Sequence, residues 1–311
     1  MHLINTWLKM EVFERGACIR GNNNMHWKEN RQIGLLIITM VYIIAGTAAV
    51  IVYRQLPELN LVGRIFWADI TATLIVYLSG VVLNNATVYD AYWSVAPMVI
   101  VNGLVISLNL SGAAIWLLLF AVNFWGIRLT VNWVNTFVDL RHQDWRYDML
   151  RNSFPKTYPL VSLGGIHLFP TLVVFFALVP AIRYIEQPAL NSLTLTALMV
   201  CITATVLQFV ADLQMQRFRS IRKSSREIMN QGLWKYARHP NYFGEILFWW
   251  GMYLFLLSAR PELWTLCAGA LLNTGMFLFI SIPMAEKRLS RRKPGYAAYK
   301  AKTRLFLPLK K

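Results

Sequence analysis

The chain is poor in charged residues, and in acidic residues above all. Only 15% of its 311 residues are charged, 15 Asp and Glu stand against 31 Lys and Arg, and 56% of the residues are hydrophobic. Several apolar runs reach the roughly 20 residues with which a helix crosses a bilayer. The composition therefore argues against a soluble protein and indicates an integral membrane protein with several spans.

Other features are scarce or missing. The three cysteines, Cys18, Cys201 and Cys267, are far apart and lack metal-ligand spacing, so we expect neither a disulfide framework nor a metal site. The first 31 residues lack the apolar core of a secretory signal, and Met25 could be the true start. No P-loop, G-x-G-x-x-G, G-x-S-x-G or H-E-x-x-H motif is present. Any cofactor therefore has to be held by membrane helices and their loops.

The apolar runs predict an all-α polytopic helical bundle. Pro97 and Asn102 interrupt the third run, so a seven-span bundle with a broken hairpin is the alternative to eight spans. We divide the chain into a cytoplasmic N-terminal segment (1–32), a transmembrane domain (33–283) and a basic cytoplasmic tail (284–311). The eight expected spans cover about residues 33–53, 62–83, 92–108, 112–134, 164–185, 190–212, 242–258 and 262–283.

The positive charges favour eight spans. With that number, the N-terminal segment, the loops 135–163 and 213–241 and the tail all fall on one side, and the other side has few basic residues beyond Arg54, Arg183 and Arg260. Short cytoplasmic loops carry the Lys and Arg excess, so both termini are predicted to be cytoplasmic. The net charge of +16 points to anionic headgroups and an anionic cofactor rather than to nucleic acid.

Polar residues inside the spans are informative because a central Arg or Asp costs about 2.5–3.5 kcal/mol on insertion scales. Two stripes with helical spacing lie toward the basic side and are expected to converge. As alternatives, Arg128 could snorkel to headgroups and the amides could bond neighbouring helices. The stripes are Trp125, Arg128, Asn132 and Asn135 in the fourth span, and Thr205, Gln208, Asp212 and Arg219 in the sixth.

A third polar set belongs to the second span and the turn after it. Asp69 lies deep in an apolar run, where it could pair with Arg64. Asp90 follows Tyr89 and stands three residues before Trp93, so it could cap the third helix. Asp90, Tyr89 or Tyr92 could also serve as the acid of a reaction.

Residues 232–251, GLWKYARHPNYFGEILFWWG, mix basic and aromatic residues just before an apolar run. Pro240 is tolerated in a first helical turn and predicts a helix start there. Arg238 and His239 would then lie beside the positive end of this helix, with Tyr242 and Glu245 three residues apart on one face. This stretch is therefore a candidate site for an anionic ligand.

Two further segments combine aromatic and basic residues. In residues 144–151, DWRYDMLR, Arg146 could stack on a heterocycle and pair with phosphate, although the segment could equally form an aromatic belt at the membrane surface. In the basic tail, Tyr296 and Tyr299 lie three residues apart on one helical face.

The motif LWKYARHPNYFGEILFWWG, preceded by FWGIRLTVNW and DWRYDMLR and followed by EKRLSRRKPGYAAYKAKTRLFLP, resembles the bacterial branch of the steroid 5-alpha-reductase-like family over roughly residues 65–309. Sterol reductases and isoprenylcysteine carboxyl methyltransferases have similar R-H-P-x-Y stretches and tails. The resemblance implies a helical pocket closed by cytoplasmic loops in a bacterial inner membrane. It implies NADPH as the cofactor, with S-adenosylmethionine as the alternative.

The resemblance also implies roles for individual residues. Asp90, with Tyr89 beside it, stands in for the substrate-polarising Gln-Glu pair of the animal reductases, and Trp125 aligns near their catalytic tyrosine. The arginines are expected to pair with the cofactor phosphates. The residues expected to contact the cofactor are Asn241, Tyr242, Glu245, Arg238, His239, Asp212, Arg219, Arg128, Arg146, Tyr296 and Tyr299.

The leading functional hypothesis is a membrane-embedded NADPH-dependent reductase of a lipophilic enone or a steroid-like conjugated double bond. A methyltransferase that uses S-adenosylmethionine on a lipid or prenylated substrate is the second hypothesis, and a non-enzymatic lipid-binding protein is the third. The expected partners are a lipophilic small molecule and membrane lipids, and the sequence does not indicate an oligomeric state.

Overall fold

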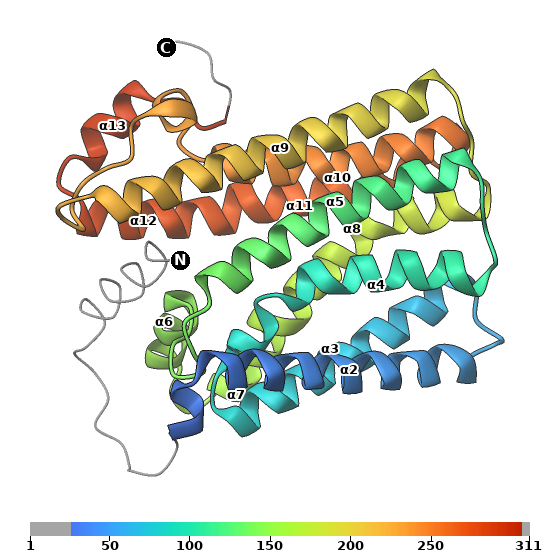
Figure 1. Cartoon of the computed structure of the whole chain (residues 1–311), viewed down its shortest axis with the longest axis horizontal. Coiled ribbons are helices and arrows are strands. Elements are labelled where there is room, and N and C mark those ends of the chain that lie inside the picture. The colour runs from blue at the N-terminus through green and yellow to red at the C-terminus, as the bar shows by residue number, and fades with distance from the viewer. Residues whose placement is uncertain (1–25, 307–311) are drawn as a thin grey trace.

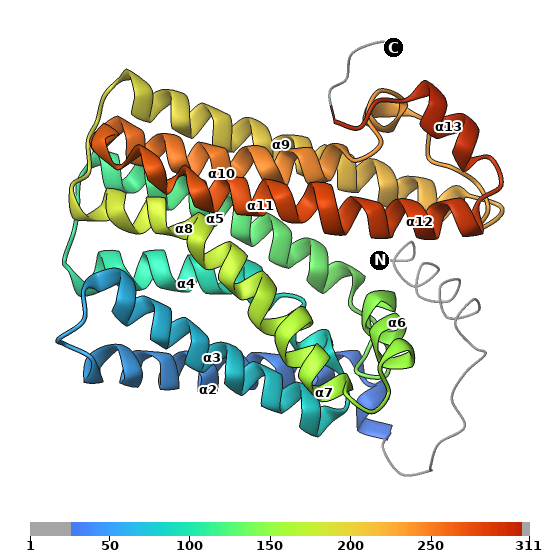
Figure 2. The same ribbon diagram turned by 180° about the vertical axis from the view of Figure 1, so that it is seen from behind.

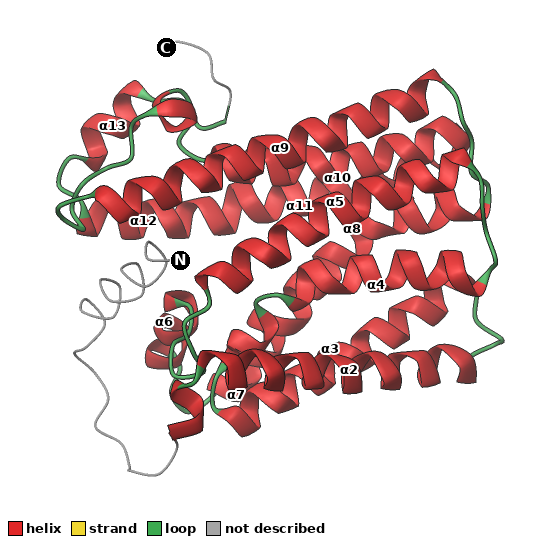
Figure 3. Cartoon of the chain, in the orientation of Figure 1, coloured by secondary structure: helices red, strands yellow, loops and turns green. Residues whose placement is uncertain are grey.

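The computed structural model describes residues 26–306, and this part of the chain is a bundle of helices without a β-strand (Figures 1 and 3). The all-helical fold expected from the composition is thus confirmed. The described residues also contain eight helices long and apolar enough to cross a membrane, as the positive charges favoured. The expectations for residues 1–25, including Cys18 and the alternative start at Met25, lie outside the described residues.

The helices follow one another as up-and-down spans. The short segments at the basic end are η1 (His26–Glu29), α6 (Trp145–Ser153), η4 (Gly232–Lys235) and α13 (Tyr296–Lys302). The first four spans are α2 (Arg31–Gln55), α3 (Leu61–Leu83), η2 with α4 (Ala86–Tyr89, Tyr92–Ser107) and α5 (Ala113–Thr136). The last four are α7, η3 and α8 (Tyr158–Val161, Ser162–Leu168, Phe169–Glu186), α9 (Ser192–Ile221), α10 (Pro240–Ala259), and η5, α11, η6 and α12 (Pro261–Cys267, Ala268–Met276, Phe277–Ser281, Ile282–Arg292).

Several spans are longer than the apolar runs that predicted them, and two extend furthest. α9 continues to Ile221 instead of ending near 212, and the last span continues to Arg292 instead of 283. Hydropathy marks only the membrane-embedded part of a helix, whereas backbone hydrogen bonds between residues four apart continue through polar residues. The division of the chain at residues 32 and 283 stays a prediction, although α12 crosses residue 283.

The spans form two groups with a pair of helices between them. α2, α3 and α4 lie on one side, and α9, α10, α11 and α12 lie on the other (Figures 1 and 2). α5 and α8 run between the groups, where α5 packs against α4 and α9 and α8 packs against α10 and α11. The closest packing in the bundle is between α9 and α10.

The two ends of the bundle differ in character. The turns at 56–60, 108–112 and 187–191 are short and lie at one end, which we call the opposite end (Figure 1). α6, the loop 222–239 and α13 gather at the other end, which we call the basic end (Figure 1). This agrees with the predicted grouping of the basic segments on one side. Which end faces the cytoplasm stays a prediction.

Two spans contain π-helical segments, and each ends just before a proline. η3 ends at Leu168, two residues before Pro170, and η6 ends at Ser281, two residues before Pro283. Proline has no N–H to donate and presses on the carbonyl four residues earlier, and a wider turn accommodates both effects. The second of these segments contributes a side chain to the site, because Phe277 contacts the ring of Tyr242 with centroids 5.0 Å apart.

Candidate functional site

The two predicted polar stripes meet between α5 and α9. Arg128 donates to Asp212 Oδ2 at 2.8 Å through Nη1 and to Gln208 Oε1 through Nη2. Nearer the basic end, Gln216 donates to Asn132 at 2.6 Å. The Arg128 side chain is 8% exposed. It therefore does not snorkel to headgroups, and that alternative is wrong. The other alternative, that amides bond neighbouring helices, is confirmed for Asn132 by its bond from Gln216.

The first turns of α10 complete this group. α10 begins at Pro240, as predicted, which places Asn241 in the first turn, where its amide donates to Asp212 Oδ1 at 3.2 Å. One turn later, Glu245 is buried and accepts the indole N–H groups of Trp125 at 3.0 Å and Trp249 at 2.9 Å. We call Arg128, Gln208, Asp212, Asn241, Glu245 and Trp125 the Arg128 cluster.

Two donors of the Arg128 cluster have no partner among the described residues. Nε of Arg128 and Nε2 of Gln208 are buried without a hydrogen bond to any of residues 26–306. A buried donor left unpaired costs about 1–3 kcal/mol, so native proteins rarely keep one without a purpose. Both atoms carry N–H groups. A ligand bound here would therefore have to offer acceptor oxygens, as an amide or a phosphate does.

α6 connects the two helix groups at the basic end (Figure 2). Its Tyr147 hydroxyl donates to Asp90 Oδ1 at 2.6 Å, and burial together with the charge of Asp90 raises the pKa of Tyr147. On the side of α9 to α12, Arg288 of α12 places its guanidinium over the Trp145 ring of α6, 4.4 Å from the ring centroid. Arg146 in α6 interacts electrostatically with Tyr242 of α10. The DWRY segment thus lies between the groups, beside the first turn of α10.

The expectation that Asp90 caps the third helix is wrong. α4 has Ala91 at its N-cap, and no side chain there accepts a hydrogen bond from the helix. The carboxylate of Asp90 is bonded to Tyr147 instead, because the chain turns once as η2 before α4 begins and this turn directs the carboxylate toward α6.

A second buried polar group lies among α3, α4 and α8. The Tyr92 hydroxyl donates to Asp69 Oδ1 at 2.7 Å and lies 3.5 Å from Thr73 Oγ1. Thr73 is 3.1 Å from the Thr171 hydroxyl, which in turn is 2.9 Å from the Tyr89 hydroxyl. All five side chains are buried. We call them the hydroxyl chain.

The hydroxyl chain corrects one expectation and adds residues that the sequence did not reveal. Asp69 does not pair with Arg64, which donates to the Tyr53 carbonyl at 3.0 Å and lies over the Tyr53 ring. The paired hydroxyls of Thr73 and Thr171 were missed. Each is a single small polar residue in an apolar run, and nothing in the sequence indicates that two such residues far apart are neighbours.

The two polar groups approach each other through tryptophans. Trp93, next to Tyr92 in α4, lies 6.4 Å from Trp125 between ring centroids. Trp125 also stacks on Phe248, with centroids 4.6 Å apart and planes 9° apart. An aromatic layer thus separates the Arg128 cluster from the hydroxyl chain.

Other predicted cofactor contacts gather around Glu286 of α12, which we call the tail anchor. Glu286 accepts from Arg238 at 2.8 Å and from Lys300 at 2.6 Å, and His239 Nε2 lies 3.4 Å from it. The tail also pairs with the chain at this point, since the N–H of Arg238 donates to the Arg304 carbonyl at 2.9 Å. Arg238 and His239 therefore hold the tail in place.

The tail tyrosines belong to the same region. The Tyr299 hydroxyl donates to the Trp234 carbonyl, and burial raises the pKa of Tyr299 to about 12. Tyr296 is buried, and its hydroxyl has no partner among residues 26–306. Tyr242 stacks on His239 with centroids 5.3 Å apart, so it lies between the tail anchor and α6. The cofactor roles of all these residues stay predictions.

Comparison with known proteins assigns the chain to a family. A family described as "Protein of unknown function (DUF1295)" matches residues 76–303. The chain belongs to this family. DUF1295 is a steroid 5-alpha-reductase-like family, in agreement with the resemblance of the motifs. The matched DUF1295 segment includes the whole Arg128 cluster and α6, whereas Asp69 and Thr73 of the hydroxyl chain precede it.

The chain is also similar to a fungal protein. "Uncharacterized protein C594.04c" of Schizosaccharomyces pombe is 26% identical to this chain over an alignment of 301 residues. The alignment covers 82% of this chain and 86% of the relative. Comparison with solved structures gives no match. The comparisons therefore support a family, and they name no reaction.

Proposed function

We propose that this protein is an integral membrane reductase that uses NADPH to reduce a lipophilic enone or a steroid-like conjugated double bond. One observation carries the proposal. A buried hydroxyl donor, Tyr92 bonded to Asp69, lies across the Trp93–Trp125 contact from a cluster with two unpartnered N–H donors. A reductase of this kind needs a proton donor and a cofactor site close together in a water-poor interior.

The Arg128 cluster has the chemistry that NADPH requires. Arg128 Nε and Gln208 Nε2 are free to donate to the carboxamide oxygen, and Asn241 and Glu245 offer further donors and acceptors. When bound, the nicotinamide would supply a hydride to the β-carbon of the conjugated bond. The guanidinium of Arg146 at the basic end is suited to the phosphates, because it binds them in a fork.

The hydroxyl chain has the chemistry that the substrate requires. As an enone accepts a hydride, negative charge develops on its carbonyl oxygen, and a preorganised O–H donor stabilises that charge. We assign this donor to Tyr92. Asp69 holds the hydroxyl in place before the substrate binds, and the single hydroxyl hydrogen would then turn from Asp69 Oδ1 to the carbonyl oxygen of the substrate. Asp90 fits the role less well than Tyr92, because its carboxyl group faces α6, where it accepts from the Tyr147 hydroxyl.

Substituting Tyr92 tests the proposal. The purified full-length protein should bind NADPH, and adding suitable enones should deplete the NADPH absorbance. Tyr92→Phe keeps the ring and removes the donor, so we expect turnover to fall by about 10²–10⁴-fold while NADPH affinity stays unchanged. Tyr53→Phe is the matched control, since Tyr53 contributes its ring and its carbonyl, not its hydroxyl, to the contacts with Arg64.

The same preparation separates the alternatives. Binding of S-adenosylmethionine in place of NADPH would favour a methyltransferase, and binding of neither cofactor would favour a lipid-binding protein. Failure to bind NADPH would overturn the reductase proposal. Unchanged turnover in Tyr92→Phe would remove Tyr92 from the chemistry and leave the cofactor assignment standing.

A further inference from the structure

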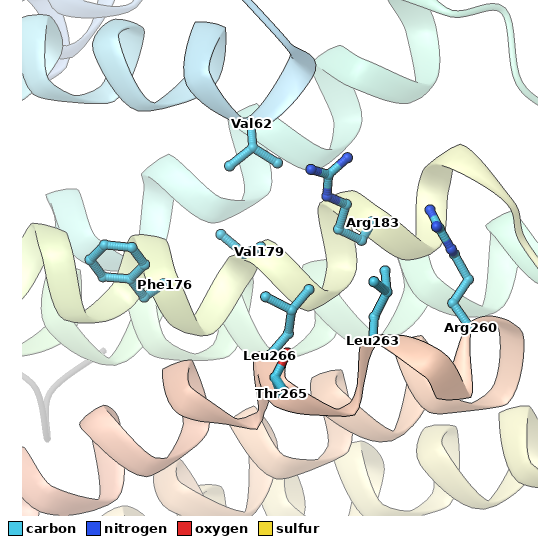
Figure 4. Close-up of a pocket in the computed structure, with 8 residues that line it drawn as sticks. All are labelled: Val62, Phe176, Val179, Arg183, Arg260, Leu263, Thr265 and Leu266. Carbon is cyan, nitrogen blue, oxygen red and sulfur yellow. The ribbon is translucent and has the colours of Figure 1, made fainter.

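A pocket lies near the opposite end of the bundle, away from the Arg128 cluster and the hydroxyl chain. It has a volume of about 430 Å³ and opens between α3, α8 and η5 (Figure 4). Its walls are mostly apolar, and two arginines stand on one side of it while Phe176 lies at the other (Figure 4). The lining residues are Val62, Phe176, Val179, Arg183, Arg260, Leu263, Thr265 and Leu266.

The two arginines belong to a mixed group of four charges, which we call the rim cluster. Arg183 donates through Nη1 to both carboxylate oxygens of Glu186, at 2.9 Å each. Arg260 lies 3.6 Å from the same Glu186 and donates to Glu262 at 3.0 Å. With two guanidinium and two carboxylate groups, the rim cluster has no net charge.

The contacts within the rim cluster leave some of its hydrogen-bonding groups available. In the contacts described for residues 26–306, Arg183 uses Nη1 alone, so its remaining N–H groups are available to a ligand. Glu262 is the most accessible member, with 60% of its side chain exposed, against 24% for Arg260. The arginines can therefore receive an anion beside the pocket, and Glu262 can receive a cation next to it.

We propose that this pocket binds one zwitterionic glycerophospholipid, of the phosphatidylethanolamine type. An acyl chain lies along Phe176, Val179 and Leu266, the phosphate pairs with Arg183 and Arg260, and the headgroup ammonium pairs with Glu262. Guanidinium groups bind phosphate through paired N–H donors. The position of the pocket suits a phospholipid, because the pocket lies near the ends of the spans. At that depth a bilayer changes from acyl chains to headgroups.

Charge complementarity selects this occupant over an anionic phospholipid. An anionic headgroup without an ammonium would satisfy the arginines but would leave Glu262 facing a second negative charge. Like charges in contact are unfavourable, and they discriminate against the wrong partner. The proposal concerns the opposite end of the bundle and does not depend on the reductase activity.

Lipid binding to the purified full-length protein tests this inference. Native mass spectrometry would compare phosphatidylethanolamine with phosphatidylglycerol of the same acyl chains. We expect one phosphatidylethanolamine per chain, held at least about tenfold more tightly than phosphatidylglycerol. Leu266→Trp should fill the pocket, and Arg183→Gln should remove a phosphate donor, so both should lose the bound lipid. Arg54→Gln, an exposed arginine near the same end that does not line the pocket, is the control.

Glu262→Gln keeps the test decisive if a pocket variant fails to fold. Glu262 is exposed and makes a surface ion pair of little stabilising value, so this variant should fold normally. It should lose the preference for phosphatidylethanolamine and bind both lipids equally. Equal binding of both lipids by the unaltered protein, or an unchanged preference in Glu262→Gln, would overturn the proposal.

Discussion

The side chains of Asp139, in the loop after α5, and of Arg128, inside the bundle, are largely covered, at 4% and 8% exposed, but their hydrogen bonds differ. Asp139 accepts from the backbone and the guanidinium of Arg141, at 2.8 and 2.9 Å, and from His142 at 2.8 Å, so its carboxylate is fully paired by its own loop. Arg128 and Gln208 each keep a buried N–H that has no partner in the part of the chain that the structure describes. The first pattern is that of a structural residue, and the second agrees with the ligand site that we propose at the Arg128 cluster.

Asp139→Asn should reduce stability in a pH-dependent way. Burial by itself raises the pKa of Asp139, but the bonds from His142 and Arg141 outweigh this and lower the pKa from 3.8 to about 2. The ionised carboxylate therefore stabilises the fold above pH 4, and this contribution is lost as the pH falls through about 2. At neutral pH we expect a loss on the order of 1–2 kcal/mol, measured by unfolding in detergent.

The pH dependence distinguishes this cause from a general loss of packing. The difference between the unaltered protein and Asp139→Asn should be constant from neutral pH to about pH 5 and should shrink below pH 4. Asp148→Asn, at an exposed site in α6, should show little difference at any pH. A deficit for Asp139→Asn that is as large at pH 3 as at pH 7 would contradict the role of its charge.

At the scale of the helices, small residues bring α9 and α10 together. A Cβ at Gly251 would lie 2.4 Å from Cys201 Sγ, and one at Gly244 would lie 2.8 Å from the Ala204 carbonyl. Within a membrane, such small residues let helix backbones approach closely and pack. This approach also brings Asn241 of α10 within hydrogen-bonding distance of Asp212 on α9. The packing of two helices therefore sets the geometry of the site.

Gly251→Val should force α9 and α10 apart. The new side chain would overlap Cys201, and overpacking of this kind costs about 1–3 kcal/mol. We expect a lower unfolding temperature in detergent and weaker cofactor binding. Gly103→Val is the matched control, because no atom of residues 26–306 lies within 4 Å of a Cβ at Gly103 in α4. Equal effects of the two substitutions would contradict the importance of the α9–α10 contact.

At the scale of the whole molecule, the long connections and the tail gather at one end. α6 lies between the helix groups there, and Glu286 ties α13 to the loop that precedes α10 (Figure 1). The Arg128 cluster is nearer this end, because Asn241 is in the first turn of α10. The same end thus supplies the positive charge and the elements that would cover a bound dinucleotide.

Labelling of single cysteines should establish which end faces the cytoplasm. In a variant without Cys18, Cys201 and Cys267, Lys302→Cys at the basic end should react with an impermeant maleimide only from the cytoplasmic side. Leu190→Cys, 57% exposed at the opposite end, should react only from the other side. The reverse pattern would contradict the predicted orientation, and labelling of both from one side would contradict the eight-span topology.

Much of this architecture could be inferred from sequence alone, because the signals are local. Apolar length predicts the spans, Pro240 marks the start of α10, and the positive charges group the loops at one end. The spacing of Arg128 in one span and Asp212 in another predicted two stripes that meet, and they do meet.

Which polar residue meets which depended on the rotation and tilt of every helix, and these follow from packing across the whole bundle. Asp69 bonds to Tyr92 and not to Arg64, which lies near it in sequence. Thr73 meets Thr171 from another helix, and Arg238 meets Glu286 of the last span. If either helix of a pair were rotated about its axis by part of a turn, the two side chains would no longer meet. Local sequence does not contain that angle, and only the packed tertiary structure decides it.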